Sequence, residues 1–127
     1  MKTIWIVDDD EDMVHAVQLM LKLLDCETRY FLSVPPAARI LLAGEHPDLF
    51  ILDINMPGVS GIEFLEFMRG RKDLRNIPIV MLSTEASDGM VDRAMALGAD
   101  AYVTKPVSLD ELEAAMKKAL RAHGENE

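Results

Sequence analysis

Three carboxylates stand directly after short apolar runs of the sequence. Asp53 follows Leu49–Leu52, and the pair Asp8 and Asp9 follows Thr3–Val7. Apolar runs of this length, bounded by turn-forming residues, are typical of strands buried on both faces of a parallel sheet. Because such sheets place their chemistry at the carboxyl ends of the strands, we expect the three carboxylates to meet in one crevice. Each of them alone could be a turn residue that serves only its own backbone.

Two further polar side chains follow the last two predicted strands. Ser83 comes after Ile79–Leu82, and Lys105 follows the short run Ala101–Val103. Taken singly, each could be a turn residue or a solvated loop residue. Because four strand ends all carry a suitable group, coincidence is a poor explanation, and we treat the five side chains as one predicted site.

The residue types in this predicted site suit phosphoryl transfer. Three carboxylates and one ammonium sum to -2, which one divalent cation would cancel. Oxygen ligands with several waters favour Mg²⁺ over a calcium cage. Asp53 can then be a nucleophile that forms an acyl phosphate. Lys105 and Ser83 can stabilise the phosphoryl oxygens.

The elements that must position these residues alternate along the chain. Each apolar run is followed by residues at helical spacing, which predicts five strands and five helices. The expected fold is α/β, a doubly wound parallel sheet of order 2-1-3-4-5 with flavodoxin-like topology. The predicted strands are Thr3–Val7, a more polar edge strand Glu27–Leu32, Leu49–Leu52, Ile79–Leu82 and Ala101–Val103.

Capping residues predict where several helices begin. Ser60 and Glu63 have capping-box spacing, as do Ser108 and Glu111, and Ser33 is expected to cap the helix that follows the edge strand. One further helix is expected from about Asp88 to Leu97, and the first lies between the acidic cluster and Leu24. We expect one domain over residues 1–122 and a flexible tail over 123–127.

The bulk composition excludes several classes of protein. The chain has 127 residues, a net charge of -9 and one cysteine, Cys26, which we expect to be buried. The negative charge argues against direct binding of nucleic acid or of an anionic membrane. No apolar run is long enough to span a membrane, and we expect no signal peptide from the first residues of the sequence. We therefore expect a cytoplasmic protein that is a monomer or a weak homodimer.

The sequence resembles the response-regulator receiver domains of bacterial two-component systems, and is similar to the single-domain chemotaxis-type regulators. The resemblance covers Lys2 to about Ala122. It is carried by the acidic pair Asp8-Asp9, by the D-x-x-M-P-x-x-x-G run from Asp53 to Gly61, by Ser83, and by Lys105-Pro106.

The resemblance implies that Asp53 accepts a phosphoryl group from a phosphohistidine of a histidine kinase or phosphotransfer protein. It implies a signalling module that catalyses only its own phosphorylation and dephosphorylation, in a two-component system or phosphorelay. The implied Mg²⁺ ligands are Asp8, Asp9, Asp53 and the backbone carbonyl of Asn55. Lys105 would contact the phosphoryl group, and the Lys105–Pro106 bond would be cis.

The resemblance also implies a switch in which Ser83 moves toward the phosphoryl group and Tyr102 reorients. The output surface is then expected between about Asp88 and Arg121, on the fourth helix, fifth strand and fifth helix. Asn55, Thr84 and Glu85 are expected to tune the lifetime of the phosphoryl group. Two residues depart from the family pattern. Thr84 replaces a smaller residue, and Val107 stands where an aromatic residue often follows the proline.

Three other interpretations remain open from the sequence. A flavodoxin-like FMN protein would share the fold, but its phosphate-binding loop would be rich in donors, whereas this loop is acidic. A haloacid-dehalogenase-type phosphatase would carry a D-x-D run, which Asp8–Asp10 contains without the usual following threonine. A degenerate receiver used as a scaffold would not need the complete acidic site. We expect the output to pass through a partner, a relay or a domain outside this sequence, and the cognate kinase is not identified.

Overall fold

Strands and helices alternate along the chain in the computed structural model, which describes residues 1–85 and 87–124. No helix in these ranges is both long and apolar enough to cross a lipid bilayer. The elements are β1 (Thr3–Val7), α1 (Glu11–Leu23), β2 (Glu27–Phe31), α2 (Val34–Leu42), β3 (Leu49–Asp53), α3 (Gly61–Arg69), β4 (Ile79–Ser83), α4 (Asp88–Ala96), β5 (Ala101–Thr104) and α5 (Leu109–Ala122).

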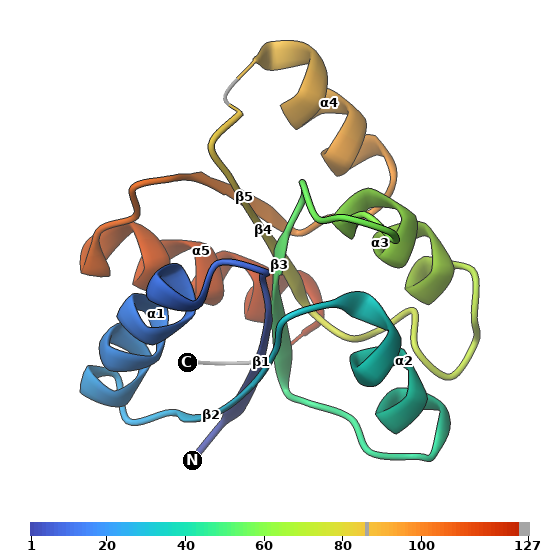
Figure 1. Cartoon of the computed structure of the whole chain (residues 1–127), viewed down its shortest axis with the longest axis horizontal. Coiled ribbons are helices and arrows are strands. Elements are labelled where there is room, and N and C mark those ends of the chain that lie inside the picture. The colour runs from blue at the N-terminus through green and yellow to red at the C-terminus, as the bar shows by residue number, and fades with distance from the viewer. Residues whose placement is uncertain (86, 125–127) are drawn as a thin grey trace.

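The five strands form one parallel sheet in the order β2-β1-β3-β4-β5. This confirms the predicted fold, and β2 lies at an edge as its polar sequence indicated. Helices α1 and α5 cover one face of the sheet, and α2, α3 and α4 cover the other (Figure 1). Successive strands are therefore added on one side of β1 first and then on its other side, beginning with β3. Strands β1 and β3 pair through Ile4–Val7 and Leu49–Leu52.

The sheet separates two apolar cores. Along β3, Phe50 and Leu52 point into the core under α2, α3 and α4, while Leu49 and Ile51 point into the core under α1 and α5. Every residue of β3 and of β4 is buried. Each fully buried large apolar side chain contributes about 1.5–3 kcal/mol relative to exposure. This is why an apolar run without alternation forms a central strand here.

The capping boxes are formed at two of the predicted helix starts. The Ser60 hydroxyl accepts from the Glu63 amide, and the Ser108 hydroxyl accepts from the Glu111 amide. Ser33 occupies the N-cap position of α2, but its side chain makes no capping hydrogen bond, so the predicted cap is wrong in this respect. An N-cap side chain accepts hydrogen bonds from the backbone amides at the second and third positions of the helix. In α2 both positions are prolines, which have no N–H.

A partly buried ion pair joins elements at the amino-terminal edge of the sheet. Arg69, at the end of α3, places Nη2 3.0 Å from Asp100 Oδ2 and donates from Nε to the Gly98 carbonyl at 2.8 Å. Asp100 Oδ2 also accepts from the Ile79 amide at 2.8 Å and lies 2.9 Å from His123 Nε2. One carboxylate oxygen thus joins α3, β4 and the end of α5. The remaining part of the predicted tail, residues 125–127, lies outside the described residues.

Two methionines of α4 face inward. Met90 and Met95 are partly buried against the core under α2, α3 and α4. Their packing against this core accounts for the apolar side chains at both positions. Arg93 of α4 and Lys117 and Arg121 of α5 are exposed.

Candidate functional site

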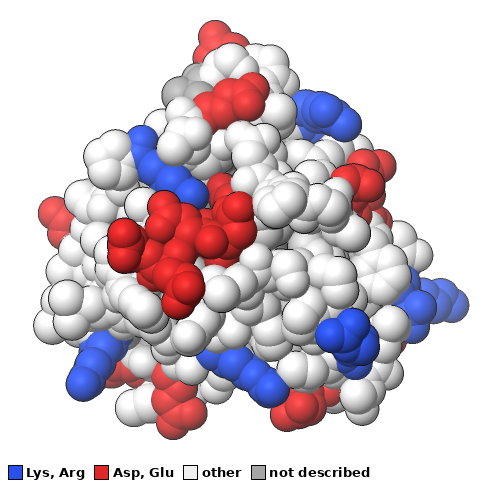
Figure 2. Space-filling model, in the orientation of Figure 1, with Lys and Arg blue, Asp and Glu red and all other residues white. Residues whose placement is uncertain are grey.

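The three predicted carboxylates meet at the carboxyl edge of the sheet. In register, Val7 pairs with Leu52, so the residues that follow them, Asp8 and Asp53, lie side by side. Oxygens of Asp8, Asp9 and Asp53 all lie within 4.8 Å of one another. Asp8 is 1% exposed and Asp53 5%, whereas Asp9 is exposed. Figure 2 shows acidic side chains gathered beside the start of α1.

Lys105 reaches this cluster from the loop after β5. Its Nζ lies 3.0 Å from Asp8 Oδ2 and donates to Asp53 Oδ1 at 3.2 Å. The Lys105 amide donates to the Ser83 carbonyl at 2.8 Å, which holds this loop against the end of β4. The Lys105–Pro106 peptide bond is cis, as the family resemblance implied. The structure thus brings one ammonium between two buried carboxylates.

Burial and neighbouring charges shift the pKa values of these groups. Burial and the Asp8 charge raise the pKa of Asp53 to about 6, and Lys105 opposes this shift without cancelling it. Burial lowers the pKa of Lys105, but the adjacent Asp8 and Asp53 carboxylates outweigh burial and leave that pKa raised. Lys105 is therefore charged near neutral pH, and Asp53 is mostly ionised there at a cost in free energy.

One oxygen of the cluster lacks a hydrogen bond. Asp8 Oδ1 accepts from the Asp10 amide at 3.0 Å, which fixes the loop into α1. Asp8 Oδ2 is buried and, apart from its ion pair with Lys105, has no well-aligned hydrogen-bond donor among the described residues. An unsatisfied carboxylate oxygen beside two further carboxylates fits a hard divalent cation such as Mg²⁺. The donor set is compatible with that ion, because all three candidate ligands offer oxygen.

Gly61 allows α3 to begin directly against the end of β3. A Cβ atom built on Gly61 would overlap the backbone carbonyl oxygen of Asp53. The Gly61 amide donates to the Ile54 carbonyl at 2.9 Å, so the loop from Asp53 to α3 closes on itself. The sequence motif contained Gly61, but only the packing explains why a larger residue does not fit.

Ser83 and Tyr102 both hold the loop after β4. The buried Ser83 hydroxyl accepts from the Glu85 amide at 3.0 Å, and the Tyr102 hydroxyl donates to the Glu85 carbonyl at 2.6 Å. The sequence had predicted a link between Ser83 and Tyr102, and Glu85 is their shared partner. A movement of the Ser83 side chain would therefore change a hydrogen bond in the same loop that Tyr102 contacts.

The remaining predicted residues lie around the cluster with different exposures. Asn55 and Thr84 are exposed in the loops after β3 and β4, at the same edge of the sheet. Val107 is buried in the core under α1 and α5. The departure of Val107 from the family pattern therefore concerns packing, a point that the sequence had left open.

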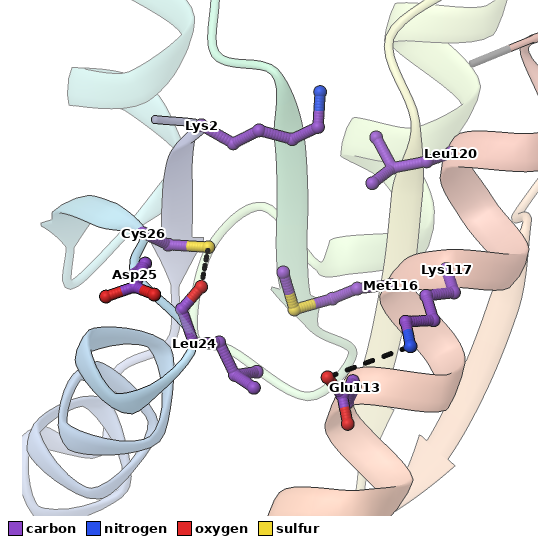
Figure 3. A pocket seen from close by; sticks show the side chains of 8 residues that line it. All are labelled: Lys2, Leu24, Asp25, Cys26, Glu113, Met116, Lys117 and Leu120. Atoms are coloured by element: carbon purple, nitrogen blue, oxygen red, sulfur yellow. Dashed lines mark hydrogen bonds and ion pairs between the residues drawn. The ribbon is translucent and has the colours of Figure 1, made fainter. Parts of the chain in front are cut away.

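A hollow of about 140 Å³ lies at the opposite end of β1, between the loop after α1 and the side of α5 (Figure 3). Cys26 lines it and is half-buried, less than expected, with Sγ 3.7 Å from the Leu24 carbonyl oxygen. Lys117 and Glu113 form an ion pair at 3.8 Å on its other side. These groups do not converge on one point as the acidic residues do, so this hollow is not a candidate active site.

A doubly wound sheet with an acidic pair after β1, an aspartate after β3 and a lysine after β5 defines a class of signalling receiver domains. The family model for the response regulator receiver domain matches residues 4–117. The chain therefore belongs to the response regulator receiver domain family, whose members are modules of two-component signalling.

Curated relatives and solved structures agree with this assignment. The chain is 33% identical to the phosphate regulon transcriptional regulatory protein PhoB of Pseudomonas aeruginosa, over 97% of this chain and 53% of that protein. It is 31% identical to the transcriptional regulatory protein KdpE of Mycobacterium tuberculosis, over 95% of this chain and 52% of that protein. The chain spans about a third to a half of the length of the curated relatives it matches. The structure of the Vibrio cholerae chemotaxis protein CheY4 superposes with a TM-score of 0.85 at 27% identity, covering 94% of this chain and 99% of CheY4.

Proposed function

We propose that this receiver domain accepts a phosphoryl group on Asp53 from a phosphohistidine of a histidine kinase or phosphotransfer protein. The observation that carries the proposal is the position of Asp53. Its side chain is buried beside Asp8 and shares the Lys105 ammonium with it, at the carboxyl edge of the sheet. Membership of the receiver family supports the same reaction.

In this reaction an oxygen of Asp53 attacks phosphorus, a P–O bond forms, and the P–N bond to the donor imidazole breaks. The imidazole leaves with the electron pair of that bond. Asp53 must be ionised to attack, and a pKa of about 6 meets this requirement at neutral pH. Lys105, held 3.2 Å from Asp53 Oδ1, is placed to neutralise a phosphoryl oxygen.

Asp8, Asp9, Asp53 and the Asn55 carbonyl are the proposed ligands of Mg²⁺. When bound, the ion supplies positive charge to the phosphoryl oxygens. The three carboxylate oxygens within 4.8 Å of one another, with one ammonium among them, support a cation at this point. Asp8 Oδ1 is engaged by the Asp10 amide, so Asp8 is already oriented before any ion binds.

The proposed switch runs from Ser83 to Tyr102. If the Ser83 side chain moved toward the phosphoryl group to donate a hydrogen bond to it, the bond that Ser83 now accepts from the Glu85 amide would lengthen or break. The loop that Tyr102 contacts would then rearrange and alter the surface of α4, β5 and α5. Arg93 and Arg121 are exposed on α4 and α5 and are proposed contacts for an output partner. Lys117 of α5 is also exposed, but it lines the hollow beside Cys26, on the side of the helix that faces the loop after α1.

Acetyl phosphate with Mg²⁺ tests the proposal without a protein donor. Intact-mass measurement should find one added phosphoryl group on the wild-type chain, and mapping should place it on Asp53. Asp53→Asn retains the shape of the side chain but lacks the nucleophile, so its labelling should be lost. An acid-stable phosphate on a serine, or equal labelling of the variant, would contradict the proposal.

Lifetime tuning by Asn55, Thr84 and Glu85 is a separate part of the proposal. All three are exposed around the site, and Thr84 is larger than the residue usual in the family. Thr84→Ala should speed phosphorylation by acetyl phosphate or loss of the label. Unchanged rates would remove Thr84 from the proposal and leave the assignment of Asp53 intact.

A further inference from the structure

The two carboxylate oxygens of Asp8 are held by different groups. Oδ1 accepts a hydrogen bond from the Asp10 amide at 3.0 Å, and Oδ2 lies 3.0 Å from Lys105 Nζ. The Asp8 amide donates to the Phe31 carbonyl at 3.1 Å, which ties the backbone to the end of β2. Because the two oxygens of an ionised carboxylate are chemically equivalent, the Asp10 amide decides which of them faces the Lys105 ammonium.

The side chain of Asp10 fixes the backbone that carries this amide. Asp10 is the N-cap of α1, and its Oδ1 accepts from the Asp12 amide at 3.0 Å and from the Met13 amide at 3.2 Å. Its carbonyl oxygen accepts from the Val14 amide at 3.0 Å. Asp10 is thus joined to the first turn of α1 through both its side chain and its carbonyl, while its N–H is directed at Asp8.

Helix α1 is itself fixed to the sheet by its buried face. Val14, Val17 and Leu21 are fully buried and belong to the core under α1 and α5. Protein interiors are close-packed, so the helix cannot shift along the sheet without disturbing this core. The core therefore sets the position of the first turn of α1. The cap on Asp10 passes that position to the amide that holds Asp8.

We infer that Asp10 is a positioning residue, whose capping side chain holds its own amide on Asp8 Oδ1 and so keeps Asp8 oriented as a ligand of Mg²⁺. The inference rests on the proposed function, because the Mg²⁺ site proposed there uses Asp8. Hydrogen bonds from outside a ligand set commonly orient the ligands of metal ions, and their loss lowers metal affinity about 10- to 100-fold. Asp10 needs no contact with the ion for this role.

The charge of Asp10 is a second route by which this residue could act on a cation. A nearby carboxylate attracts a cation whatever its orientation, whereas a cap needs an acceptor oxygen at a fixed place. Asn and Ser are as good as Asp at the N-cap position of a helix, and Ala is much poorer. Asp10→Asn, Asp10→Ser and Asp10→Ala all remove the same charge. A comparison among these three variants therefore isolates the effect of the cap.

Two measurements on the full chain test the inference without a phosphodonor. Titration with Mg²⁺, followed by amide chemical shifts, gives the dissociation constant of the ion. This constant should be about tenfold higher for Asp10→Ala than for Asp10→Asn, and Asp10→Ser should lie within about twofold of Asp10→Asn. Amide hydrogen exchange in chelator, corrected for intrinsic rates, reports the bond to Asp8 directly. The amide of residue 10 should exchange about tenfold faster in Asp10→Ala than in Asp10→Asn.

Ser87→Ala is the matched control for the loss of a helix cap. Ser87 is the N-cap of α4, and its hydroxyl oxygen accepts from the Met90 amide at 3.3 Å. This variant loses a cap on a different helix and keeps the bond between Asp10 and Asp8. Its dissociation constant for Mg²⁺ should therefore stay within about twofold of wild type. Urea denaturation checks that each variant is folded under the conditions of the titration.

Equal dissociation constants for the three variants of Asp10 would overturn the inference, since Asp10 would then act through its charge alone or not at all. So would equal exchange of the residue 10 amide in Asp10→Ala and Asp10→Asn. If Ser87→Ala weakened Mg²⁺ binding as much as Asp10→Ala, the loss would follow from helix capping in general and the inference would be wrong. A wild-type chain that binds no Mg²⁺ would instead contradict the ligands of the proposed function, and the exchange at residue 10 would still decide whether Asp10 holds Asp8.

Discussion

At the scale of single residues, the site holds more negative than positive charge in a small buried volume. Asp8 and Asp53 share one ammonium, Lys105, and Asp9 adds a third carboxylate from the surface. Ionisation of Asp53 costs free energy because the carboxylate is buried and lies beside the charge of Asp8, and the one ammonium compensates only in part. The pKa of Asp53 is raised for this reason. A bound cation or a second positive group would relieve this cost.

Mg²⁺ should therefore raise the stability of the folded chain. Only the folded state assembles the three carboxylates, so binding stabilises it by linkage, by about 1.4 kcal/mol at a concentration ten times the dissociation constant. Thermal melts with and without Mg²⁺ measure this effect. Asp9→Ala removes an exposed ligand with little effect on packing, and should abolish most of the Mg²⁺-dependent shift. Equal shifts in both proteins would place the ion elsewhere.

The raised pKa of Asp53 predicts how stability depends on pH in the absence of divalent ions. The folded chain holds this proton up to a pH of about 6, whereas the unfolded chain releases it near its ordinary pKa of 3.8. The contribution of Asp53 therefore makes stability fall as the pH rises between these values, by about 3 kcal/mol at most. Asp53→Asn cannot ionise, so it should be more stable than wild type at neutral pH, and the two should converge near pH 4.

Urea denaturation of wild type and Asp53→Asn in chelator, across this range of pH, measures the difference. Lys105 keeps Asp8 as a partner in the variant, so the substitution does not strand its charge. A variant less stable than wild type at neutral pH would mean that the Lys105–Asp53 pair outweighs the burial cost.

At the scale of elements, the site depends on how closely α3 follows β3. Gly61→Ala would force a Cβ against the Asp53 carbonyl oxygen, so the end of β3 or the start of α3 must move. We expect a loss of about 2 kcal/mol or more in the free energy of unfolding. Labelling of Asp53 by acetyl phosphate should slow as well, because the same shift displaces the nucleophile.

Gly89→Ala is the control for that substitution. A Cβ on Gly89 in α4 meets no atom within 4 Å, so it should be neutral or slightly stabilising, by less than about 1 kcal/mol. Urea denaturation compares the two variants directly. Equal losses in both would mean that glycine at position 61 is not required by the close approach to Asp53.

The ion pair at the amino edge is a second element-scale prediction. Asp100→Ala leaves Arg69 without its carboxylate and the Ile79 amide without its acceptor. We expect a loss of about 3 kcal/mol in the free energy of unfolding. Glu113→Ala breaks a solvent-exposed pair with Lys117 and should cost less than about 0.5 kcal/mol. A small loss in Asp100→Ala would show that water replaces the carboxylate at this edge.

At the scale of the whole molecule, the acidic site and the α4–β5–α5 surface are joined through the loop after β4. Ser83 and Tyr102 both bond to Glu85, one to its amide and one to its carbonyl. A phosphoryl mimic at Asp53 that recruits the Ser83 hydroxyl should therefore change the environment of this loop and of Tyr102.

Amide chemical shifts on addition of beryllofluoride and Mg²⁺ measure this response. We expect changes from Thr84 to Lys105 and along α4, and a smaller response in Ser83→Ala, which still binds the mimic. Shifts confined to the neighbours of Asp53 would show that this surface is not the output.

Much of this architecture is encoded locally, and the sequence predicted it for that reason. Strands buried on both faces are continuous apolar runs, so Leu49–Leu52 and Ile79–Leu82 identify the centre of the sheet without an alignment. Parallel strands end at one edge, so Asp8, Asp53, Ser83 and Lys105 could be grouped before any coordinates were known. Capping boxes depend on residues three apart, and both predicted boxes are formed.

The tertiary structure decided the features that depend on contacts between distant segments. The sequence by itself determined the fold, the order of strands and the grouping of the acidic residues, because periodicity and strand ends are local properties. It contained no sign that Arg69 pairs with Asp100, or that both Ser83 and Tyr102 bond to Glu85. Nor did it indicate that Leu42 and Phe67 line one apolar hollow between α2 and α3. Such contacts depend on strand register and on which sides of two helices face each other. The spacing of apolar residues along a helix indicates only which side of that helix packs against the core.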